Sequence, residues 1–331
     1  MSENLPIRVD REFYLQVHES DNYLCALYGI YGKRFSDYRE EWKKAGTLKH
    51  LPTLPLHIEL EINNYCNLRC RMCHFSQYEH LRSPKADMTL SLLKRLTEQC
   101  EGQIPAIGVG AGAECLLHPR IEDILHILTH SSFMDIIVHT NGTCLTPQLG
   151  QLLIDLKIPR LNISLDAATP DTYRKIRGGR LDIVEHNLCH LLDEKKRINA
   201  QLPYVRLTFV KLPENTHEIP LFLEKWNSHV DRIDFQRLVQ LQGEDDNCDT
   251  TNPNIDHYCS YPFHSLYVNQ NGDVFPCCTY YKRFLHIGNI KQQSIKQIWE
   301  SKIMNELRNS MKSHKLLSCC RKCLSTTSHD S

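Results

Sequence analysis

The chain has no excess of charge of either sign and no long apolar run. Lys+Arg and Asp+Glu both total 39 among 331 residues, so the formal net charge is zero. A balanced charge provides no electrostatic footprint for nucleic acid or for an anionic membrane. No apolar stretch approaches the roughly 18 residues that a membrane span requires. We therefore expect neither nucleic acid nor a membrane among the partners.

The first residues also lack the basic and apolar regions of a signal peptide, so we expect a cytoplasmic protein. Hydrophobic residues make up 41% of the chain, enough to bury a full-sized core, and this excludes wholesale disorder. The length of 331 residues suggests about two domains.

Cysteine, by contrast, is abundant, with 15 residues. Disulfides rarely persist in a reducing cytosol, so a cysteine-rich cytosolic protein more often binds metal or performs redox chemistry. Three cysteines lie within residues 66–73 and six within 259–323. We interpret the remaining ones as mostly small buried hydrophobic residues: Cys25, Cys100, Cys115, Cys144, Cys189 and Cys248.

Short apolar runs alternate with longer stretches of helical spacing in the first two thirds of the chain. Such alternation favours parallel strands joined by right-handed helical crossovers. Six such units are fewer than the eight that close a full barrel. We therefore predict an α/β fold, an open, partial (β/α)6 barrel of the TIM type. The predicted strands are residues 56–62, 106–109, 136–139, 161–165, 205–209 and 233–235.

The composition changes near residue 241, where the polar segment 243–247 predicts a linker. Beyond it, two short apolar runs flank Asn271-Gly272, a strong hairpin signal, and a single helix is predicted near 295–311. The N-terminal part shows one helical stretch, near 38–45. These observations divide the chain into an N-terminal extension (1–53), a barrel core (54–240) and a small C-terminal α+β domain (241–331).

The main chemical signal is a C-x3-C-x2-C motif formed by Cys66, Cys70 and Cys73, directly after the first predicted strand. Three thiolates on one tight loop can hold three irons of a cubane and leave the fourth iron open to a ligand. A zinc site usually combines two C-x2-4-C pairs of cysteines, and no second pair of this kind lies near residues 66–73. Coincidence and zinc remain the alternatives.

This motif in this place resembles the signature of the radical S-adenosylmethionine (SAM) enzymes. The resemblance covers about residues 56–240 and implies a SAM-binding [4Fe-4S] cluster in a partial barrel. In that family, polar residues at the carboxyl ends of the strands contact SAM. The matching positions here are Glu114, Asn141, Ser164, Asp166 and Arg177, with Arg174 as an alternative to Arg177.

The resemblance implies that Glu114 contacts the SAM amino group and that Ser164 or Asp166 contacts the ribose or the carboxylate. Arg177 would meet the carboxylate. The sequence departs from the family where Ala113 replaces a glycine, where Cys115 replaces a common proline, and where Met72 replaces a residue that is often aromatic. Ala113 lets the backbone approach a ligand slightly less closely than glycine would.

The late cysteines resemble those of the twitch domain, a shortened relative of the SPASM domain. There, one cysteine before a hairpin, one after it and a late C-x2-C pair bind an auxiliary [4Fe-4S] cluster. The matching positions are Cys259, Cys277, Cys320 and Cys323, while Cys278 and Cys319 are adjacent and would point elsewhere. A structural zinc on the same four thiolates is the alternative.

Together, these resemblances imply a radical SAM oxidoreductase. A 5′-deoxyadenosyl radical would abstract hydrogen from a C–H bond, and the auxiliary cluster would accept an electron. An external donor of the flavodoxin or ferredoxin type would supply the electron that starts the reaction. Because only 53 residues precede the core, we favour a small molecule, such as a sugar or aminoglycoside alcohol, over a peptide substrate. His74 and His139 are candidate substrate contacts.

Three alternatives remain open. The first is an epimerase that uses Cys248, between the two cluster regions, as hydrogen donor. The second is a maturase that modifies a ribosomal peptide. The third is a non-catalytic iron–sulfur or zinc protein acting as electron carrier or sensor; Glu114, Ser164 and Asp166 argue against it, because a carrier needs no SAM contacts.

Overall fold

The computed structural model describes residues 14–19, 24–77, 84–238, 259–277, 285–313, 315–317 and 320. One ten-stranded sheet runs through them in the order β1-β7-β6-β5-β4-β3-β2-β8-β9-β10. The strands from β2 to β7 are all parallel to one another, which confirms the α/β class and the partial barrel. They are β2 (His57–Leu60), β3 (Ala106–Val109), β4 (Asp135–Thr140), β5 (Arg160–Ser164), β6 (Tyr204–Lys211) and β7 (Arg232–Arg237).

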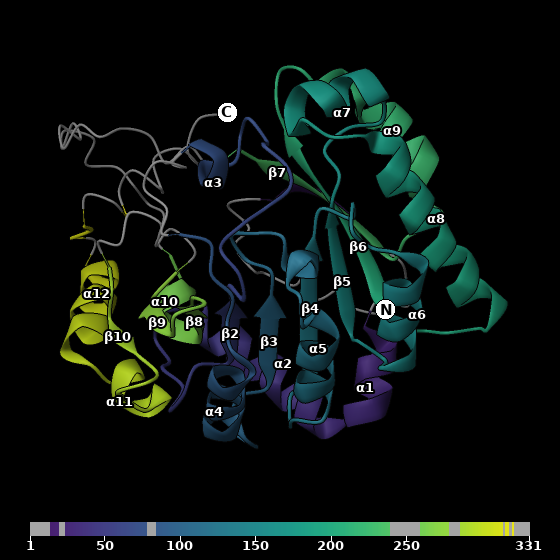
Figure 1. The fold of residues 1–331 in the computed structure, drawn as a ribbon. Helices are drawn as coiled ribbons and strands as arrows, with labels where there is room; N and C mark the ends of the chain where they lie inside the picture. The colour runs from purple at the N-terminus through teal and green to yellow at the C-terminus, as the bar shows by residue number, and fades with distance from the viewer. Residues whose placement is uncertain are drawn as a thin grey trace, which may run out of the picture.

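Helices follow most of these strands and cover the outer face of the sheet (Figure 1). Thr146 and Thr169 are the N-caps of two of these helices, because each side chain accepts a hydrogen bond from the backbone of the first helical turn. No helix within the described ranges is long and apolar enough to cross a bilayer. The helices are α4 (Leu90–Cys100), α5 (Ile121–Thr129), α6 (Pro147–Asp155), α7 (Pro170–Arg177), α8 (Leu181–Arg197) and α9 (Ile219–Trp226).

The N-terminal extension closes the amino end of the barrel, at the bottom of Figure 1. It forms α1 (Cys25–Tyr31) and α2 (Lys33–Ala45), and the ring of Trp42 on α2 lies 4.0 Å from that of His264 and 5.9 Å from that of His57. The extension also contributes β1 (Tyr14–Glu19), which pairs antiparallel with β7. The sequence predicted only a helix near 38–45, which is part of α2, and it predicted neither α1 nor β1.

The predicted hairpin is confirmed as β8 (Ser265–Val268) and β9 (Asp273–Phe275), with Gly272 at a φ of +86° in the turn. The four-residue helix α10 (Tyr261–His264) leads into it, and β10 (Gly288–Asn289) pairs with β9. Because β8 pairs in parallel with β2, the barrel sheet continues into the C-terminal region. That continuity was not predicted.

The single helix predicted over 295–311 is wrong. Two helices occupy this segment, α11 (Ile295–Trp299) and α12 (Lys302–Lys312). The break occurs because Ser301 adopts an extended backbone and its side chain accepts a hydrogen bond from the Met304 backbone N–H, which starts a new helix. The predicted linker at 243–247 lies outside the described residues. The domain boundaries at 53/54 and 240/241 stay predictions.

Candidate functional site

The loop that carries the first cysteine motif leaves the carboxyl end of β2 and packs against the end of α7. The backbone N–H of Arg71 donates to the Ile176 carbonyl at 2.9 Å, and that of Cys73 donates to the Cys70 carbonyl at 3.1 Å. Cys70 is buried, whereas Cys66 and Cys73 are half-buried. The first hydrogen bond ties the motif to α7, and the second forms a turn within the motif.

The surroundings of these thiols suit thiolate ligands. Burial raises the pKa of Cys70 to about 11, which the nearby Arg177 opposes, and burial also raises the pKa of Cys66. The Leu68 backbone N–H lies 3.4 Å from Cys66 Sγ, and Arg177 Nη1 lies 3.9 Å from Cys70 Sγ. These donors would stabilise negative charge on sulfur once protons leave.

The chemistry of these three side chains suits an iron–sulfur cubane. Within the described ranges, no three Cys, His, Asp or Glu side chains converge closely enough to hold one metal ion. A zinc ion requires every thiolate sulfur at about 2.3 Å, whereas each cysteine of a cubane binds a different iron. Three cysteine thiolates on one loop are the donor set that a [4Fe-4S] cluster with one open iron uses.

Glu114 lies after β3, at the start of the 3₁₀ turn Cys115–Leu117, and is 2% exposed. Its carboxylate accepts hydrogen bonds from the Thr140 hydroxyl at 2.6 Å and from the Asn141 backbone N–H at 2.7 Å, both at the end of β4. A third comes from the Leu116 backbone N–H at 3.2 Å. Burial raises the pKa of Glu114, although these donors oppose the shift.

Asn141 connects Glu114 to the cysteine loop. Its backbone binds Glu114, while its side-chain amide donates to Asn67 Oδ1 at 3.0 Å and lies 3.7 Å from Cys66 Sγ. The structure thus brings Glu114, Asn141 and Cys66 together, as the family resemblance implies. Sequence reasoning missed Asn67, which sits between two of the cysteines.

Asp166 and Arg177 form a buried ion pair beside this loop. Arg177 Nε donates to Asp166 Oδ2 at 2.8 Å, and Arg177 Nη2 binds the same oxygen. Asp166 Oδ1 accepts from the Val210 backbone N–H at 2.7 Å. Both Asp166 oxygens are thus engaged by protein, which leaves Arg177 Nη1, near Cys70, as the group of this pair directed at the site. Arg174, by contrast, is 71% exposed and pairs with Asp171.

The second cysteine group is described only in part. Cys259 precedes α10, Cys277 follows β9 and Cys320 follows α12; all three are half-buried. Cys259 and Cys320 pack against the same hydrophobic core. Cys323 lies outside the described residues, as do Cys248, Cys278 and Cys319, so their predicted roles stay predictions.

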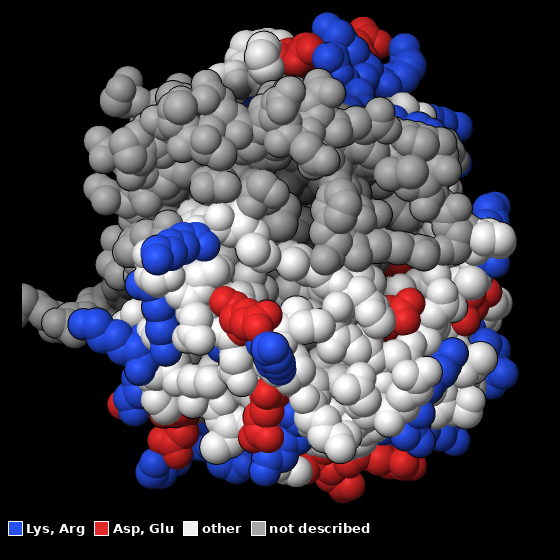
Figure 2. Space-filling model, turned by 90° about the vertical axis from the view of Figure 1, so that its left-hand side faces the viewer, with Lys and Arg blue, Asp and Glu red and all other residues white. Residues whose placement is uncertain are grey.

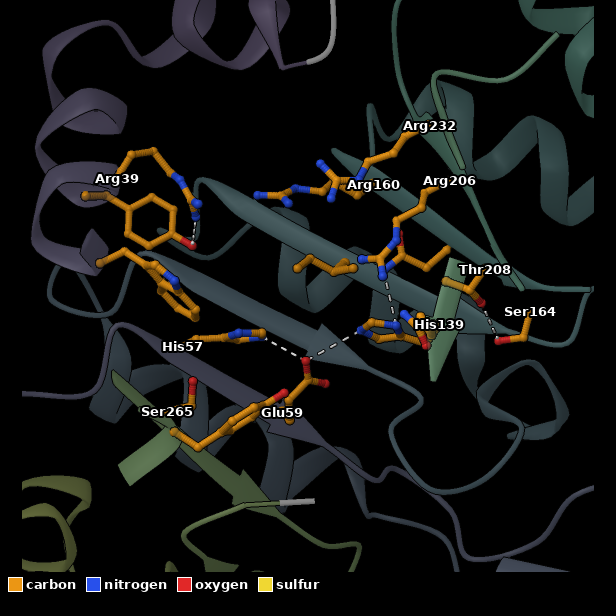
Figure 3. A pocket seen from close by; sticks show the side chains of 16 residues that line it. Arg39, His57, Glu59, His139, Arg160, Ser164, Arg206, Thr208, Arg232 and Ser265 are labelled. Carbon is orange, nitrogen blue, oxygen red and sulfur yellow. Dashed lines mark hydrogen bonds and ion pairs between the residues drawn. The ribbon is translucent and has the colours of Figure 1, made fainter. Parts of the chain in front are cut away.

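A cavity of about 270 Å³ occupies the barrel lumen. Its wall is polar and comes mainly from the inward faces of β2, β4, β5, β6 and β7, with α2 at one end (Figure 3). Ser164 lines this cavity, where its hydroxyl accepts from the Thr208 hydroxyl at 3.3 Å. Other wall residues are Arg39, His57, Glu59, His139, Arg160, Asn162, Arg206 and Arg232.

In the middle of this wall, the Glu59 carboxylate lies between two imidazoles (Figure 3). Its Oε1 is 3.2 Å from His57 Nε2 and 3.5 Å from His139 Nε2. Burial would raise the pKa of Glu59, but the charges and hydrogen bonds of His139 and His57 outweigh it and hold the pKa well below its usual range. Glu59 is therefore ionised at neutral pH.

Except for His139 and Ser164, sequence reasoning missed this wall, although a signal was present. Residues 57, 59 and 61 are polar and alternate with apolar residues, as do 160, 162 and 164. In parallel strands that helices cover on one side, such alternation indicates that the other side faces a polar lumen.

Two family models match the chain: the Radical SAM superfamily over residues 60–220 and SPASM, an iron–sulfur cluster-binding domain, over residues 259–324. Among curated proteins, the tungsten-containing aldehyde ferredoxin oxidoreductase cofactor-modifying protein of Pyrococcus furiosus is 24% identical over 80% of this chain and 86% of that protein. The probable GTP 3′,8-cyclase of Methanococcus maripaludis is 27% identical over 50% of this chain and only 53% of its own length.

Solved structures share the fold. BtrN in complex with AdoMet and 2-DOIA has a TM-score of 0.57 and 21% identity, over 82% of this chain and 94% of BtrN. The protein anSMEcpe with bound AdoMet has a TM-score of 0.62 and 14% identity, over 84% and 88%. SuiB of Streptococcus suis, bound to precursor peptide SuiA, has a TM-score of 0.58 and 13% identity, over 83% and 71%.

The C-terminal match is to an iron–sulfur domain, so the structural-zinc alternative is set aside. The cofactors are SAM with its [4Fe-4S] cluster and an auxiliary iron–sulfur cluster. By its barrel, its cysteine loop and both matches, the chain belongs to the radical SAM superfamily and carries a SPASM iron–sulfur domain at its C-terminus.

Proposed function

We propose that this protein is an oxidoreductase that converts an alcohol carbon of a small molecule into a ketone. The observation that carries the proposal is the polar lumen cavity and its position. His139 on β4 lines the cavity, and the next residue, Thr140, donates to Glu114. A cavity of about 270 Å³ lies just below the range of about 300–1,000 Å³ typical of pockets for drug-sized ligands, which suits a small hydroxylated molecule.

When bound, the cofactors would supply a hydrogen-abstracting 5′-deoxyadenosyl radical and, at the auxiliary cluster, an acceptor for one electron. When the secondary alcohol becomes a ketone, its hydroxyl group also releases one proton, which completes the balance. Glu114 and Arg177 are proposed to hold the amino and carboxylate groups of SAM, and Asp166 to position Arg177. The cavity wall would orient the hydroxyl-bearing carbon and limit access of water.

The test is anaerobic incubation of reconstituted protein with SAM, a reductant and candidate alcohols. One candidate is 2-DOIA, the compound in the BtrN complex, and others are myo-inositol and D-glucosamine. We expect a product lighter by two hydrogens and one 5′-deoxyadenosine per product. Release of 5′-deoxyadenosine together with an unchanged alcohol in every case would reject the proposed substrate class.

The same assay in heavy water separates the oxidoreductase from the epimerase. A thiol that returns hydrogen to the substrate exchanges with solvent, so an epimerised product has unchanged mass apart from one deuterium. Cys248→Ala would then abolish deuterium incorporation, whereas we expect this substitution to be nearly silent. A protein that releases no 5′-deoxyadenosine at all would be an electron carrier or sensor.

A further inference from the structure

Three arginines on the wall of the lumen cavity have carboxylate partners, whereas two acceptor atoms on the same wall have no donor. Arg160 pairs with the fully buried Asp135, and Arg206 and Arg232 both pair with the fully buried Asp234. By contrast, Glu59 Oε2 and Asn162 Oδ1 are buried and accept no hydrogen bond, and Asn162 is only 5% exposed. A buried acceptor without a donor destabilises the native state, so such atoms require an explanation.

Both acceptors are held in place by His139. Its Nδ1 accepts from Asn162 Nδ2 at 3.2 Å, which leaves Asn162 Oδ1 on the other side of the amide group. Its Nε2 lies 3.5 Å from Glu59 Oε1, so Oε2 is the oxygen without a partner. Behind the carboxylate, Gly108 has no side chain, and a Cβ there would lie 2.3 Å from Oε2. The arrangement therefore has little freedom to turn these acceptors away.

A ligand with hydrogen-bond donors would satisfy these two acceptors. Hydroxyl and ammonium groups are donors, whereas a carboxylate or phosphate offers acceptors only. Glu59 is the ionised acceptor of the two, and hydrogen bonds to ionised groups are the stronger ones. The arginines would favour an anion, but three of the four already have carboxylate partners.

We propose that the lumen cavity binds a polyhydroxylated amine, with the ammonium group at Glu59 and a hydroxyl group at Asn162. This inference rests on the proposed function, since it names the class of alcohol that the enzyme would oxidise. His57, His139 and Gly108 then act as positioning residues that hold Glu59 toward the ligand. The cavity volume of about 270 Å³ limits the ligand to a small molecule.

The test is calorimetric titration of the oxidised, SAM-bound holoenzyme under anaerobic conditions, without reductant, so that no turnover occurs. The probes are two matched pairs: D-glucosamine with D-glucose, and trans-2-aminocyclohexanol with trans-1,2-cyclohexanediol. D-glucuronate is the anionic probe. We expect the amine of at least one pair to bind about ten- to a hundredfold more tightly than its neutral partner, and glucuronate to bind most weakly.

Glu59→Gln keeps the shape of the side chain but removes its charge, and it should abolish the preference for the amine while neutral probes bind as before. Asp231→Asn is the matched control, because this carboxylate pairs with Lys195 outside the cavity, and its probe affinities should be unchanged. Tighter binding of glucuronate, equal binding within both pairs, or an unaltered preference in Glu59→Gln would overturn the inference. Because no step of turnover is measured, these outcomes are independent of whether the oxidation itself occurs.

Discussion

A single carboxylate, that of Glu114, connects three parts of the candidate SAM site. Its oxygens accept from Leu116, Thr140 and Asn141, and its backbone carbonyl accepts from the Asn63 side chain at 3.0 Å. Burial raises its pKa while these donors favour the ionised form. Glu114 therefore has a structural role besides any contact with SAM.

This double role predicts different results for two substitutions. Glu114→Gln keeps one acceptor oxygen but removes the charge, so we expect about tenfold or greater loss of SAM affinity with a smaller loss of stability than in Glu114→Ala. Glu114→Ala leaves buried donors unpaired and should also lower the unfolding free energy by about 1–3 kcal/mol. Calorimetric titration with SAM and denaturant titration measure the two effects. Unchanged SAM affinity in Glu114→Gln would remove this residue from the SAM site.

The buried Asp166–Arg177 ion pair predicts that the protein loses much of its stability when Asp166 is replaced. Asp166→Ala leaves the buried Arg177 charge without its partner, which typically costs about 3–5 kcal/mol of unfolding free energy. Arg174→Ala, at an exposed position, should cost less than about 0.5 kcal/mol. Denaturant midpoints compare the two variants. A loss of similar size in both would show that the buried pair contributes little.

At the scale of the element, the six parallel strands were predictable because each is a short apolar run followed by a helical stretch. It was not recognised from the sequence which face of each strand points into the lumen, although the polar residues 57, 59 and 61 alternate with apolar ones. The pairing of β8 with β2 was not predictable, because it depends on tertiary contacts over some 200 residues rather than on local pattern. The break at Ser301 was missed because the apolar residues keep a helical spacing throughout 295–311, on both sides of the N-cap Ser301.

The packing of α2 against α10 and the start of β8 predicts a pH dependence of stability. Burial, with the charges of His57 and Arg39, lowers the pKa of His264 from 6.5 to about 3. As the pH falls below 6.5, the unfolded chain binds this proton first, so the stabilisation is complete above pH 6.5 and is lost toward pH 3. We expect a loss of about 1 kcal/mol between pH 6.5 and 5.5.

His264→Gln retains groups that can bond to Ser260 and Ser265 but cannot take up the proton. Its unfolding free energy should therefore change less between pH 6.5 and 5.5 than that of the wild type. Urea titrations at both pH values give this comparison, and equal slopes would show that His264 is not the titrating group.

At the scale of the whole molecule, balanced charge is visible on the surface. On the face in Figure 2, Lys and Arg side chains are interspersed with Asp and Glu in the described part of the chain. The functional groups instead gather inside and at the carboxyl end of the barrel. Sequence reasoning found those at the strand ends, because the cysteine motif marks that edge, and missed most of those deeper in the lumen, where no motif exists.

The two cysteine groups predict the iron content. Reconstituted protein should hold two [4Fe-4S] clusters, about eight irons per chain. Replacing Cys66, Cys70 and Cys73 by Ala should leave about four irons, and so should replacing Cys320 and Cys323. Iron analysis with Mössbauer spectra distinguishes the remaining cluster in each variant. Loss of all iron in both would indicate that the clusters do not form independently.

The central claim is that this chain cleaves SAM at the cysteine loop after β2. The most direct measurement is the amount of 5′-deoxyadenosine released when reconstituted protein is incubated anaerobically with SAM and a reductant. The account predicts release by the wild type, retained release in Cys320→Ala/Cys323→Ala, and none when Cys66, Cys70 and Cys73 are all replaced by Ala. Release that persists in the triple variant, or that is absent from the fully loaded wild type, would contradict it.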